Sequence, residues 1–282
     1  MKKRIIALVL ATLIAALTFG LAGCGSKTDD GNTTAAPDAS TPAGTTETKT
    51  FTMGIDPEYP PFSYLGKDGE YTGFDVEVCK AVCDKLGWEF KVFAVNWDEK
   101  LVQLDSNECD CVWSGMTILD SMKEAGYVIS RPYFDNEQVL LVKEGSGFAS
   151  SKDLAGKAVA VQLGTSGESL LNEDLKDLAD TFSEVVTCDS FLKCFTELEG
   201  NAVDAVFVDR PVADSYVAEH EGFVIIDEDL GAEQYGIAFR SGDRALCAEV
   251  EGAIDALVAD GTYAKIAAKY EDIDAGNLLF LK

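Results

Sequence analysis

Phe74-Asp-Val-Glu-Val-Cys-Lys-Ala-Val-Cys-Asp-Lys-Leu86 is the stretch that decides the fold class of this chain. Its apolar residues recur at helical spacing, and Gly87 follows as a residue that typically ends a helix. Phe51–Ile55 before it and Glu89–Val95 after it have the pattern of β-strands. A helix that connects two strands in this way is the unit of a parallel sheet. The sequence therefore predicts an α/β fold.

The same alternation of strands and helices continues along the chain. Its segments are Asp98–Asp105 (helix), Cys109–Trp113 (strand), 157–162 (strand), 167–178 (helix), 181–186 (strand), 190–199 (helix), 202–208 (strand) and 211–220 (helix). Two successive helices, 244–259 and 262–270, end the pattern. Alternation of this kind predicts parallel sheets with helices on both faces.

Two extended apolar segments divide the body of the chain. Asn136–Val142 and Ala232–Phe239 each contain a Glu-Gln pair near the start. The alternating units fall before the first segment and between the two, but not after the second. This order predicts two α/β lobes joined by a two-strand hinge. One lobe is expected to contain residues 51–138 and 236–282, and the other residues 139–235.

The N-terminus has the three parts of a secretory signal peptide. A basic tip, Met1–Arg4, precedes an apolar stretch, Ile5–Phe19, and then small residues. Leu21-Ala-Gly-Cys24 resembles the lipobox of bacterial lipoproteins, in which the cysteine is lipidated and becomes the mature N-terminus. We therefore expect residues 1–23 to be a signal peptide. Lipid (palmitate) on Cys24 would anchor the protein to the cell membrane at its extracytoplasmic face.

The segment after Cys24 has the composition of a flexible linker. Gly25–Lys49 contains small and polar residues and no large apolar one. Such a stretch cannot bury enough apolar surface to offset the entropy cost of ordering. Residues 24–50 are therefore predicted to form a disordered tether between the anchor and a globular body. No later segment is long and apolar enough to cross a bilayer.

The charge of the chain is strongly negative. It contains 49 acidic and 23 basic residues, and removal of the three basic residues of the leader leaves 20, a net charge of −29. This charge argues against a nucleic-acid partner. It does not restrict the charge of a small ligand, because a pocket can differ in sign from the average surface.

The chain contains eight cysteines, and lipidation of Cys24 leaves an odd number. At least one of the remaining seven cannot pair within the chain. Cys79, Cys83 and Cys194 fall on apolar faces of predicted helices, which favours a role as core residues. Disulfides stay open as an alternative, since an exported protein meets an oxidising compartment. His220 is the only histidine, so neither a metal site nor a cofactor is predicted.

Short motifs occur in a characteristic order across the body of the chain. They are Asp56-Pro-Glu-Tyr-Pro-Pro-Phe62, Gly73–Val78, Trp113-Ser-Gly-Met-Thr-Ile118, Pro132-Tyr133, Asp153–Lys157, Gly164-Thr-Ser-Gly167 and Val203–Asp209. In this order they resemble the bacterial extracellular solute-binding proteins of family 3, which serve amino-acid ABC transporters. The resemblance implies the periplasmic-binding-protein type II fold, with a ligand cleft between the lobes. It also implies a monomer that delivers a small polar ligand, such as an amino acid, to an ABC permease.

Aromatic residues near strand ends are candidates for the walls of this cleft. Tyr59 follows the first strand, where an open α/β sheet places its ligand crevice. Phe62, in the same loop, is either a second wall or a core residue. Trp113 ends a predicted strand and is a further candidate for ligand selectivity.

Small polar residues follow the same strand as Trp113. Gly115 can bring backbone groups close to a ligand, and Ser114 and Thr117 add hydroxyl groups. An ordinary strand-to-helix turn would have a similar composition. The resemblance implies that this segment contacts the backbone of a bound amino acid.

The second lobe offers groups for both charges of an amino acid. Thr165 and Ser166 lie between a predicted strand and helix, where they could cap the helix and bind a carboxylate. Asp209 ends an apolar strand and could accept a charge-assisted hydrogen bond from an ammonium group. The resemblance implies that this aspartate holds the α-amino group of the ligand. The alternatives for Asp209 are a surface pair with Arg210 or a helix cap.

The sequence departs from the family pattern at one position. Many members have an arginine five residues after the threonine of this motif, where it clamps the ligand carboxylate. Met122 stands at that position, and a thioether cannot replace a guanidinium group. Lys123 is a candidate substitute. Alternatively, the helix N-terminus at Gly164 binds the carboxylate alone, or the ligand lacks that carboxylate. The identity of the ligand and of the permease therefore stays open.

Two other functions remain alternatives. Some cyclohexadienyl dehydratases resemble this fold, and such an enzyme would need a placed acid. Glu168 and Glu173 are better explained as solvated helix residues, so we predict that the protein is not an enzyme. A ligand-sensing lipoprotein would need a separate membrane receptor, because no transmembrane segment follows the predicted lobes.

Overall fold

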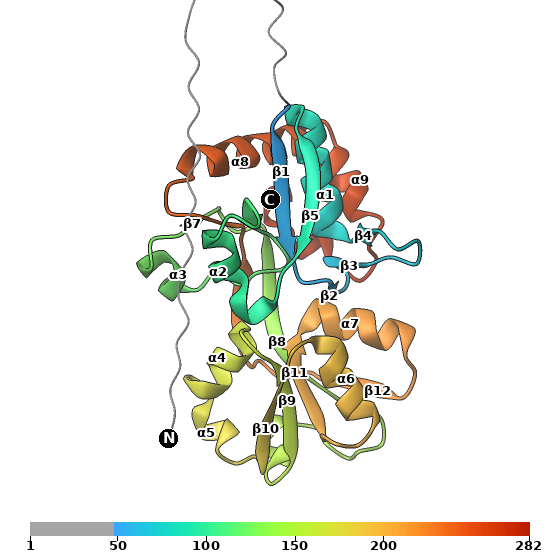
Figure 1. Cartoon of the computed structure of the whole chain (residues 1–282). Helices are drawn as coiled ribbons and strands as arrows, with labels where there is room; N and C mark the ends of the chain where they lie inside the picture. The colour runs from blue at the N-terminus through green and yellow to red at the C-terminus, as the bar shows by residue number, and fades with distance from the viewer. Residues whose placement is uncertain (1–47) are drawn as a thin grey trace, which may run out of the picture. The chain divides into compact units, whose positions relative to one another are not determined.

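Two sheets organise the fold of residues 48–282, the part of the chain that this computed structural model describes (Figure 1). The first sheet has the strand order β5-β1-β6-β14-β7. Its strands are β1 (Thr50–Ile55), β5 (Glu89–Ala94), β6 (Cys111–Val112), β7 (Val128–Ile129) and β14 (Ala238–Phe239). Strands β5 and β6 run parallel to β1, and β14 runs antiparallel to β6 and β7. We call the part of the molecule around this sheet the first lobe.

The second sheet has the order β10-β9-β11-β8-β12. Its strands are β8 (Phe134–Lys143), β9 (Ala158–Gln162), β10 (Glu184–Cys188), β11 (Ala205–Asp209) and β12 (Phe223–Ile226). Strands β9, β10 and β11 are parallel, whereas β8 is antiparallel to its neighbours. The part around this sheet is the second lobe. The two sheets, with their connecting helices, confirm the predicted α/β class.

Two antiparallel strands, β8 and β13 (Ala232–Tyr235), connect the two lobes. The C-terminal half of β8 pairs with β11 and β12, and its first residues pair with β13. The chain thus leaves the first lobe along β8 and returns along β13 to β14. These are the two segments that were predicted to cross. We propose that the lobe boundaries lie within them, between residues 138 and 139 and between residues 235 and 236.

The C-terminal helices pack on the first lobe. α1 (Phe74–Leu86) contacts both α8 (Arg244–Ala259) and α9 (Thr262–Ala267). The remaining helices are α2 (Lys100–Asp105), α3 (Asp120–Glu124), α4 (Ser166–Asn172), α5 (Lys176–Ala179), α6 (Phe191–Glu199) and α7 (Arg210–Glu219). Short 3₁₀ helices cover Trp97–Glu99, Ser151–Leu154, Ala275–Asn277 and Leu279–Leu281. A small sheet, β2-β3-β4, is formed by Glu58–Tyr59, Ser63–Leu65 and Tyr71–Thr72.

One predicted helix is divided in the structure. The sequence predicted a continuous helix over 167–178, but α4 ends at Asn172 and α5 begins at Lys176. The amide of Leu175 donates to the carbonyl of Leu170 at 2.8 Å, which closes a turn between the two helices. Leu171 lies in the apolar core of the second lobe and Leu175 packs against it. The backbone leaves the helical conformation at Glu173, which has φ −122° and ψ −93°, and the continuous helix predicted for 167–178 is therefore wrong.

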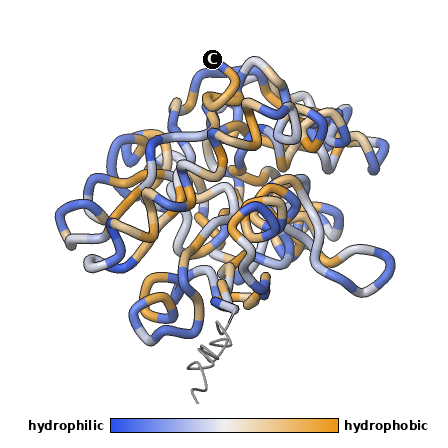
Figure 2. Tube along the Cα trace, turned by 90° about the horizontal axis from the view of Figure 1, so that it is seen from above, coloured by the Kyte–Doolittle hydropathy of each residue, from blue (hydrophilic) through white to orange (hydrophobic). Residues whose placement is uncertain are grey.

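Apolar residues fill the space between each sheet and its helices, while the projecting loops are mostly polar (Figure 2). The cysteines belong to this interior. Cys79, Cys83, Cys109, Cys111, Cys188, Cys194 and Cys247 are all buried and unpaired. Within residues 48–282, none of the helices combines the length and the apolar character that a membrane span requires. The predicted signal peptide, the lipidation of Cys24 and nearly all of the tether lie outside the described residues.

The start of α1 is fixed by a close backbone approach. The amides of Phe74 and Asp75 donate to the carbonyls of Pro61 and Phe62 at 2.9 and 3.0 Å. Gly73 precedes them with a φ of 124°, and a Cβ there would overlap the carbonyl group of Phe62. Only glycine allows this contact, which holds the loop after β2 against the helix.

We expect Gly73→Ala to lower the free energy of unfolding by about 3 kcal/mol or more, because strain and overlap add. Gly69→Ala is the matched control, since Gly69 also has a positive φ (84°) but has open space around it. The control should cost only about 1 kcal/mol. Urea denaturation followed by circular dichroism measures both, and equal losses would contradict the proposed role of the contact.

Candidate functional site

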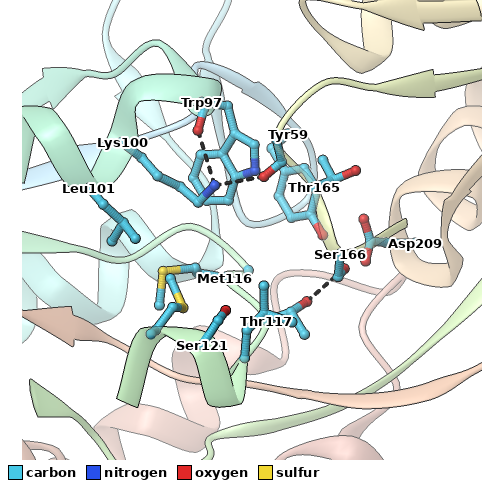
Figure 3. Close-up of a pocket in the computed structure, with 14 residues that line it drawn as sticks. Tyr59, Trp97, Lys100, Leu101, Met116, Thr117, Ser121, Thr165, Ser166 and Asp209 are labelled. Atoms are coloured by element: carbon cyan, nitrogen blue, oxygen red, sulfur yellow. Dashed lines mark hydrogen bonds between the residues drawn. The ribbon is translucent and has the colours of Figure 1, made fainter. Parts of the chain in front are cut away.

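A cavity of about 120 Å³ lies between the two lobes (Figure 3). Its first-lobe side is lined by Tyr59, Trp97, Lys100, Leu101, Gly115, Met116, Thr117, Leu119, Ser121 and Met122. Its second-lobe side is lined by Gly164, Thr165, Ser166 and Asp209. Most of these residues lie at or just after the C-terminal ends of parallel strands. That edge is where an open α/β sheet presents side chains and backbone amides to a ligand.

Asp209 is the acidic group of the cavity. Its Oδ1 accepts hydrogen bonds from Asn136 Nδ2 at 2.6 Å, Gln138 Nε2 at 2.8 Å and the hydroxyl of Tyr235 at 2.9 Å. Among the described residues, none donates a hydrogen bond to Oδ2. Burial raises the pKa of Asp209, and the nearby carboxylate of Glu233 raises it further. A cation at Oδ2 would relieve both effects, so Asp209 is built to receive one.

The hinge supplies the groups that hold Asp209. Asn136 and Gln138 are on β8, and both also donate to Oε1 of Glu233 on β13, at 2.7 and 3.0 Å. Thr117 donates to the same oxygen at 2.8 Å. None of the sequence motifs indicated this network. Asn136 and Gln138 stand two residues apart in the polar first half of β8, so both lie on one face of the strand.

Tyr59 links the first lobe to this network. Its hydroxyl lies 2.8 Å from that of Tyr235, which in turn donates to Asp209. The Tyr59 ring is buried beside Gly115, where a Cβ would overlap the ring. Gly115 also has a φ of 52°. Tyr59 and Gly115 therefore depend on each other, because the absence of a side chain at Gly115 leaves the space that the Tyr59 ring fills.

Asp75, on α1, fixes the position of Gly115. Its buried Oδ2 accepts hydrogen bonds from the amide of Gly115 at 2.8 Å and from the hydroxyl of Tyr133 at 2.6 Å. Burial raises the pKa of Asp75 to about 7, against the lowering effect of these two bonds. The folded protein therefore holds a proton on Asp75 at pH values where an unfolded chain would have released it.

This difference predicts a pH effect on stability. Between about pH 4 and about pH 7 the folded state binds more protons at Asp75, so this contribution falls as pH rises, by about 1.4 kcal/mol per pH unit. We expect Asp75→Asn to remove this component from the pH profile of unfolding in urea. Asp84→Asn, at an exposed site on the same helix, should leave the profile unchanged. Identical profiles for wild type and Asp75→Asn would contradict the assignment.

Thr165 and Ser166 lie side by side at the start of α4. Thr165 is the N-cap of the helix: its hydroxyl accepts from the amide of Glu168 at 3.2 Å, as the sequence suggested. The Glu168 side chain in turn accepts from the amide of Gly164 at 2.7 Å. Ser166 Oγ lies 3.1 Å from Thr117 Oγ1 of the first lobe, so hydroxyls from both lobes meet at the cavity (Figure 3).

Other predicted candidates do not line the cavity. Ser114 is buried below it, where its hydroxyl accepts from the amide of Asp56 at 3.1 Å. Phe62 and Trp113 are buried core aromatics, packed near Tyr59 and Tyr133. Lys123 lies on the surface, paired with Asp120 at 3.0 Å, with 53% of its side chain exposed. The structure therefore offers no route by which Lys123 could replace the absent arginine.

Trp97 and Lys100 are lining residues that the sequence analysis did not identify. Lys100 Nζ donates to the carbonyl of Trp97 at 3.1 Å and, across the cleft, to the carbonyl of Gly164 at 2.7 Å. It also lies 4.7 Å from the centre of the Trp97 ring. Burial lowers the pKa of Lys100 to about 8, although Asp98, Asp56 and Glu168 oppose that effect. Their short segment follows β5, and its composition gave no signal beyond that of a surface helix.

The described residues offer no group of three or more His, Cys, Asp or Glu side chains that could hold a metal ion. The site is thus a small cavity with one acidic group, one basic group, several hydroxyls and an apolar wall.

Residues 51–272 match the bacterial extracellular solute-binding proteins, family 3. The chain belongs to this family. It is 32% identical over 231 residues to the L-cystine-binding protein TcyJ of Escherichia coli, covering 81% of this chain and 85% of that protein. The resemblance drawn from the motifs is thereby confirmed.

Solved structures with the same fold include binding proteins for different ligands. An ancestral arginine-binding protein bound to arginine is 35% identical, with a TM-score of 0.73 over 79% of this chain and 98% of that one. An ancestral amino acid-binding protein, described as a precursor of cyclohexadienyl dehydratase, is 32% identical, with a TM-score of 0.70 over 78% and 95%. The type II periplasmic-binding-protein fold is therefore shown.

Proposed function

We propose that this protein captures an amino acid in the cavity between its lobes and delivers it to an ABC permease. The observation that carries the proposal is the Asp209 carboxylate, which reaches the cavity with one oxygen saturated by hinge donors and the other free. An α-ammonium group matches such a site in charge and in donor geometry. Relatives named for binding cystine and arginine support amino acids as the ligand class.

Capture requires that ligand binding favours the closed arrangement of the lobes. The cavity is lined from both sides, so a ligand there contacts the first lobe at Tyr59 and Thr117 and the second at Ser166 and Asp209. These contacts exist together only when the lobes are closed. The ligand thus shifts the equilibrium by its differential affinity for the closed state.

We infer that the protein is not an enzyme. Asp209 is the only acid among the described residues that line the cavity, and three donors hold its Oδ1. Glu168, one of the two acids considered from the sequence, caps its own helix through Gly164, and Glu173 is exposed. A general acid must lie within hydrogen-bonding reach of the reacting group, and neither glutamate lines the cavity.

We further propose that the protein works at the extracytoplasmic face of the cell membrane, as a monomer, with lipid on Cys24 as its anchor. The family is described as extracellular, and the Leu21–Cys24 motif supports lipidation. An anchored binding protein stays close to its permease, which raises its local concentration there. The predicted tether of residues 24–50 would permit the lobes to move near the membrane.

A thermal-shift screen of the purified protein against the common amino acids tests the function. A ligand should stabilise the folded state by about 2.7 kcal/mol at a hundredfold excess over its Kd. We expect Asp209→Asn to abolish that shift, because the neutral amide loses the charge that attracts an ammonium group. It should leave the hinge bonds largely in place, since an amide oxygen also accepts hydrogen bonds.

Asp229→Asn is the matched control, because Asp229 is an exposed acid of the loop between β12 and β13. This variant should keep the full ligand-induced shift. If no amino acid stabilises the wild-type protein while another small metabolite does, the proposed ligand class is wrong. If Asp209→Asn binds as tightly as wild type, the assignment of Asp209 is wrong.

A further inference from the structure

The charges of the cavity are arranged as one opposed pair. Among the described residues that line it, Lys100 is the only cation and Asp209 is the only acid. Figure 3 shows them on opposite sides, with Tyr59 and Thr165 between them. The hydroxyls of Thr117 and Ser166 lie on the side of Asp209, whereas Leu101 and Met116 lie on the side of Lys100. A ligand whose ammonium group lies at Asp209 and whose chain extends across the cavity therefore brings its far end to Lys100.

In the closed arrangement of the lobes, backbone carbonyls hold Lys100 in place. Its ammonium group donates to the carbonyls of Trp97 and Gly164, one from each lobe. The Gly164 turn comes so close that a Cβ there would lie 2.7 Å from the Cα of Asp98. Packing thus restricts movement of the Lys100 segment relative to the second lobe when the lobes are closed. A pKa of about 8 keeps the group mainly charged at neutral pH.

The rest of this wall carries no charge. Met122 is buried and lines the cavity beside Met116, Leu101 and Leu119. These side chains solvate a second cation poorly and offer no carboxylate that could pair with one. A positively charged ligand side chain would have to approach the Lys100 ammonium inside a cavity where charges are weakly screened.

We propose that Lys100 determines the ligand specificity of this site: it excludes amino acids with cationic side chains and selects those whose uncharged or acidic side chain ends in a hydrogen-bond acceptor. This inference rests on the proposed amino-acid function. It separates this protein from relatives named for arginine, although the fold is shared. The Lys100 ammonium group would attract ligands with an acceptor at the end of the side chain and repel ligands with a cationic side chain. Specific sites commonly combine the two effects.

Isothermal titration calorimetry with the common amino acids, on the full-length protein, tests the inference. For the wild type we expect the tightest ligand to have an uncharged or acidic side chain. Arginine and lysine should bind about tenfold more weakly or worse, the factor expected for one charge-assisted hydrogen bond. Lys100→Met should weaken the tightest ligand by a similar factor and reduce the penalty against arginine. Lys67→Met, at an exposed turn between β3 and β4, should change neither value.

Lys100→Arg distinguishes recognition from a purely structural role in lobe closure. The variant keeps the positive charge, so it should still discriminate against arginine and lysine even if its overall affinity falls. A role in closure alone would make Lys100→Met weaken all ligands by the same factor, and that result would overturn the inference. Tight binding of arginine to the wild type would also overturn it, while leaving the amino-acid function intact. A protein that binds no amino acid would refute both.

Discussion

A buried chain of hydrogen bonds from Tyr59 through Tyr235 to Asp209 holds the functional part of this protein together. Tyr59 belongs to the first lobe, Tyr235 to a hinge strand and Asp209 to the second lobe. Each group is buried, so each must keep a partner or lose the free energy of its hydration. In the closed arrangement, each of the three groups has a hydrogen-bond partner. The same bonds that close the lobes therefore orient the carboxylate toward the cavity.

The loop that follows β6 depends on a second buried carboxylate. Asp75 holds the amide of Gly115, and Gly115 leaves the space that the Tyr59 ring fills. Helix α1 is itself docked by the glycine at its start, through backbone bonds to the loop after β2. Local backbone constraints far apart in the sequence thus converge on the ring of Tyr59. Because this wall of the cavity is already ordered, ligand binding there has a low entropic cost of ordering side chains.

Several residues that the motifs indicated line the cavity, because the ends of strands carry a strong local signal in the sequence. Tyr59, Gly115 and Thr117 follow strands of the first sheet, and Thr165, Ser166 and Asp209 follow or end strands of the second. All six line the cavity. Phe62, Ser114 and Trp113 belong to the same motifs but face the interior. A motif names the segment, whereas the direction of each side chain depends on a turn whose geometry the sequence does not reveal.

The residues that set the chemistry of the cavity were harder to find. Lys100 comes from a short helical segment with an ordinary surface composition, and it meets Gly164 only because the lobes close. Asn136, Gln138 and Glu233 stand among other polar residues of the hinge strands, so the sequence does not distinguish them from surface residues. The hydrogen bonds that join these residues to one another, to Asp209 and to Thr117 connect positions 71 to 116 residues apart in the chain. The periodicity of helices and strands is a local pattern and gives no information on contacts between residues so far apart in the chain.

The sequence by itself determined the α/β class, the order of the lobes and the family, because hydrophobic periodicity and short motifs are local properties. It also specified Met122, a residue whose thioether cannot bind a carboxylate as a guanidinium group does. Only the tertiary structure determined that Lys100 lies opposite Asp209 and that Lys123 lies on the surface. It also brought together the hydrogen-bonded residues of the hinge. The physical reason is that charge complementarity in a cleft arises between segments that meet only after both lobes have folded and closed.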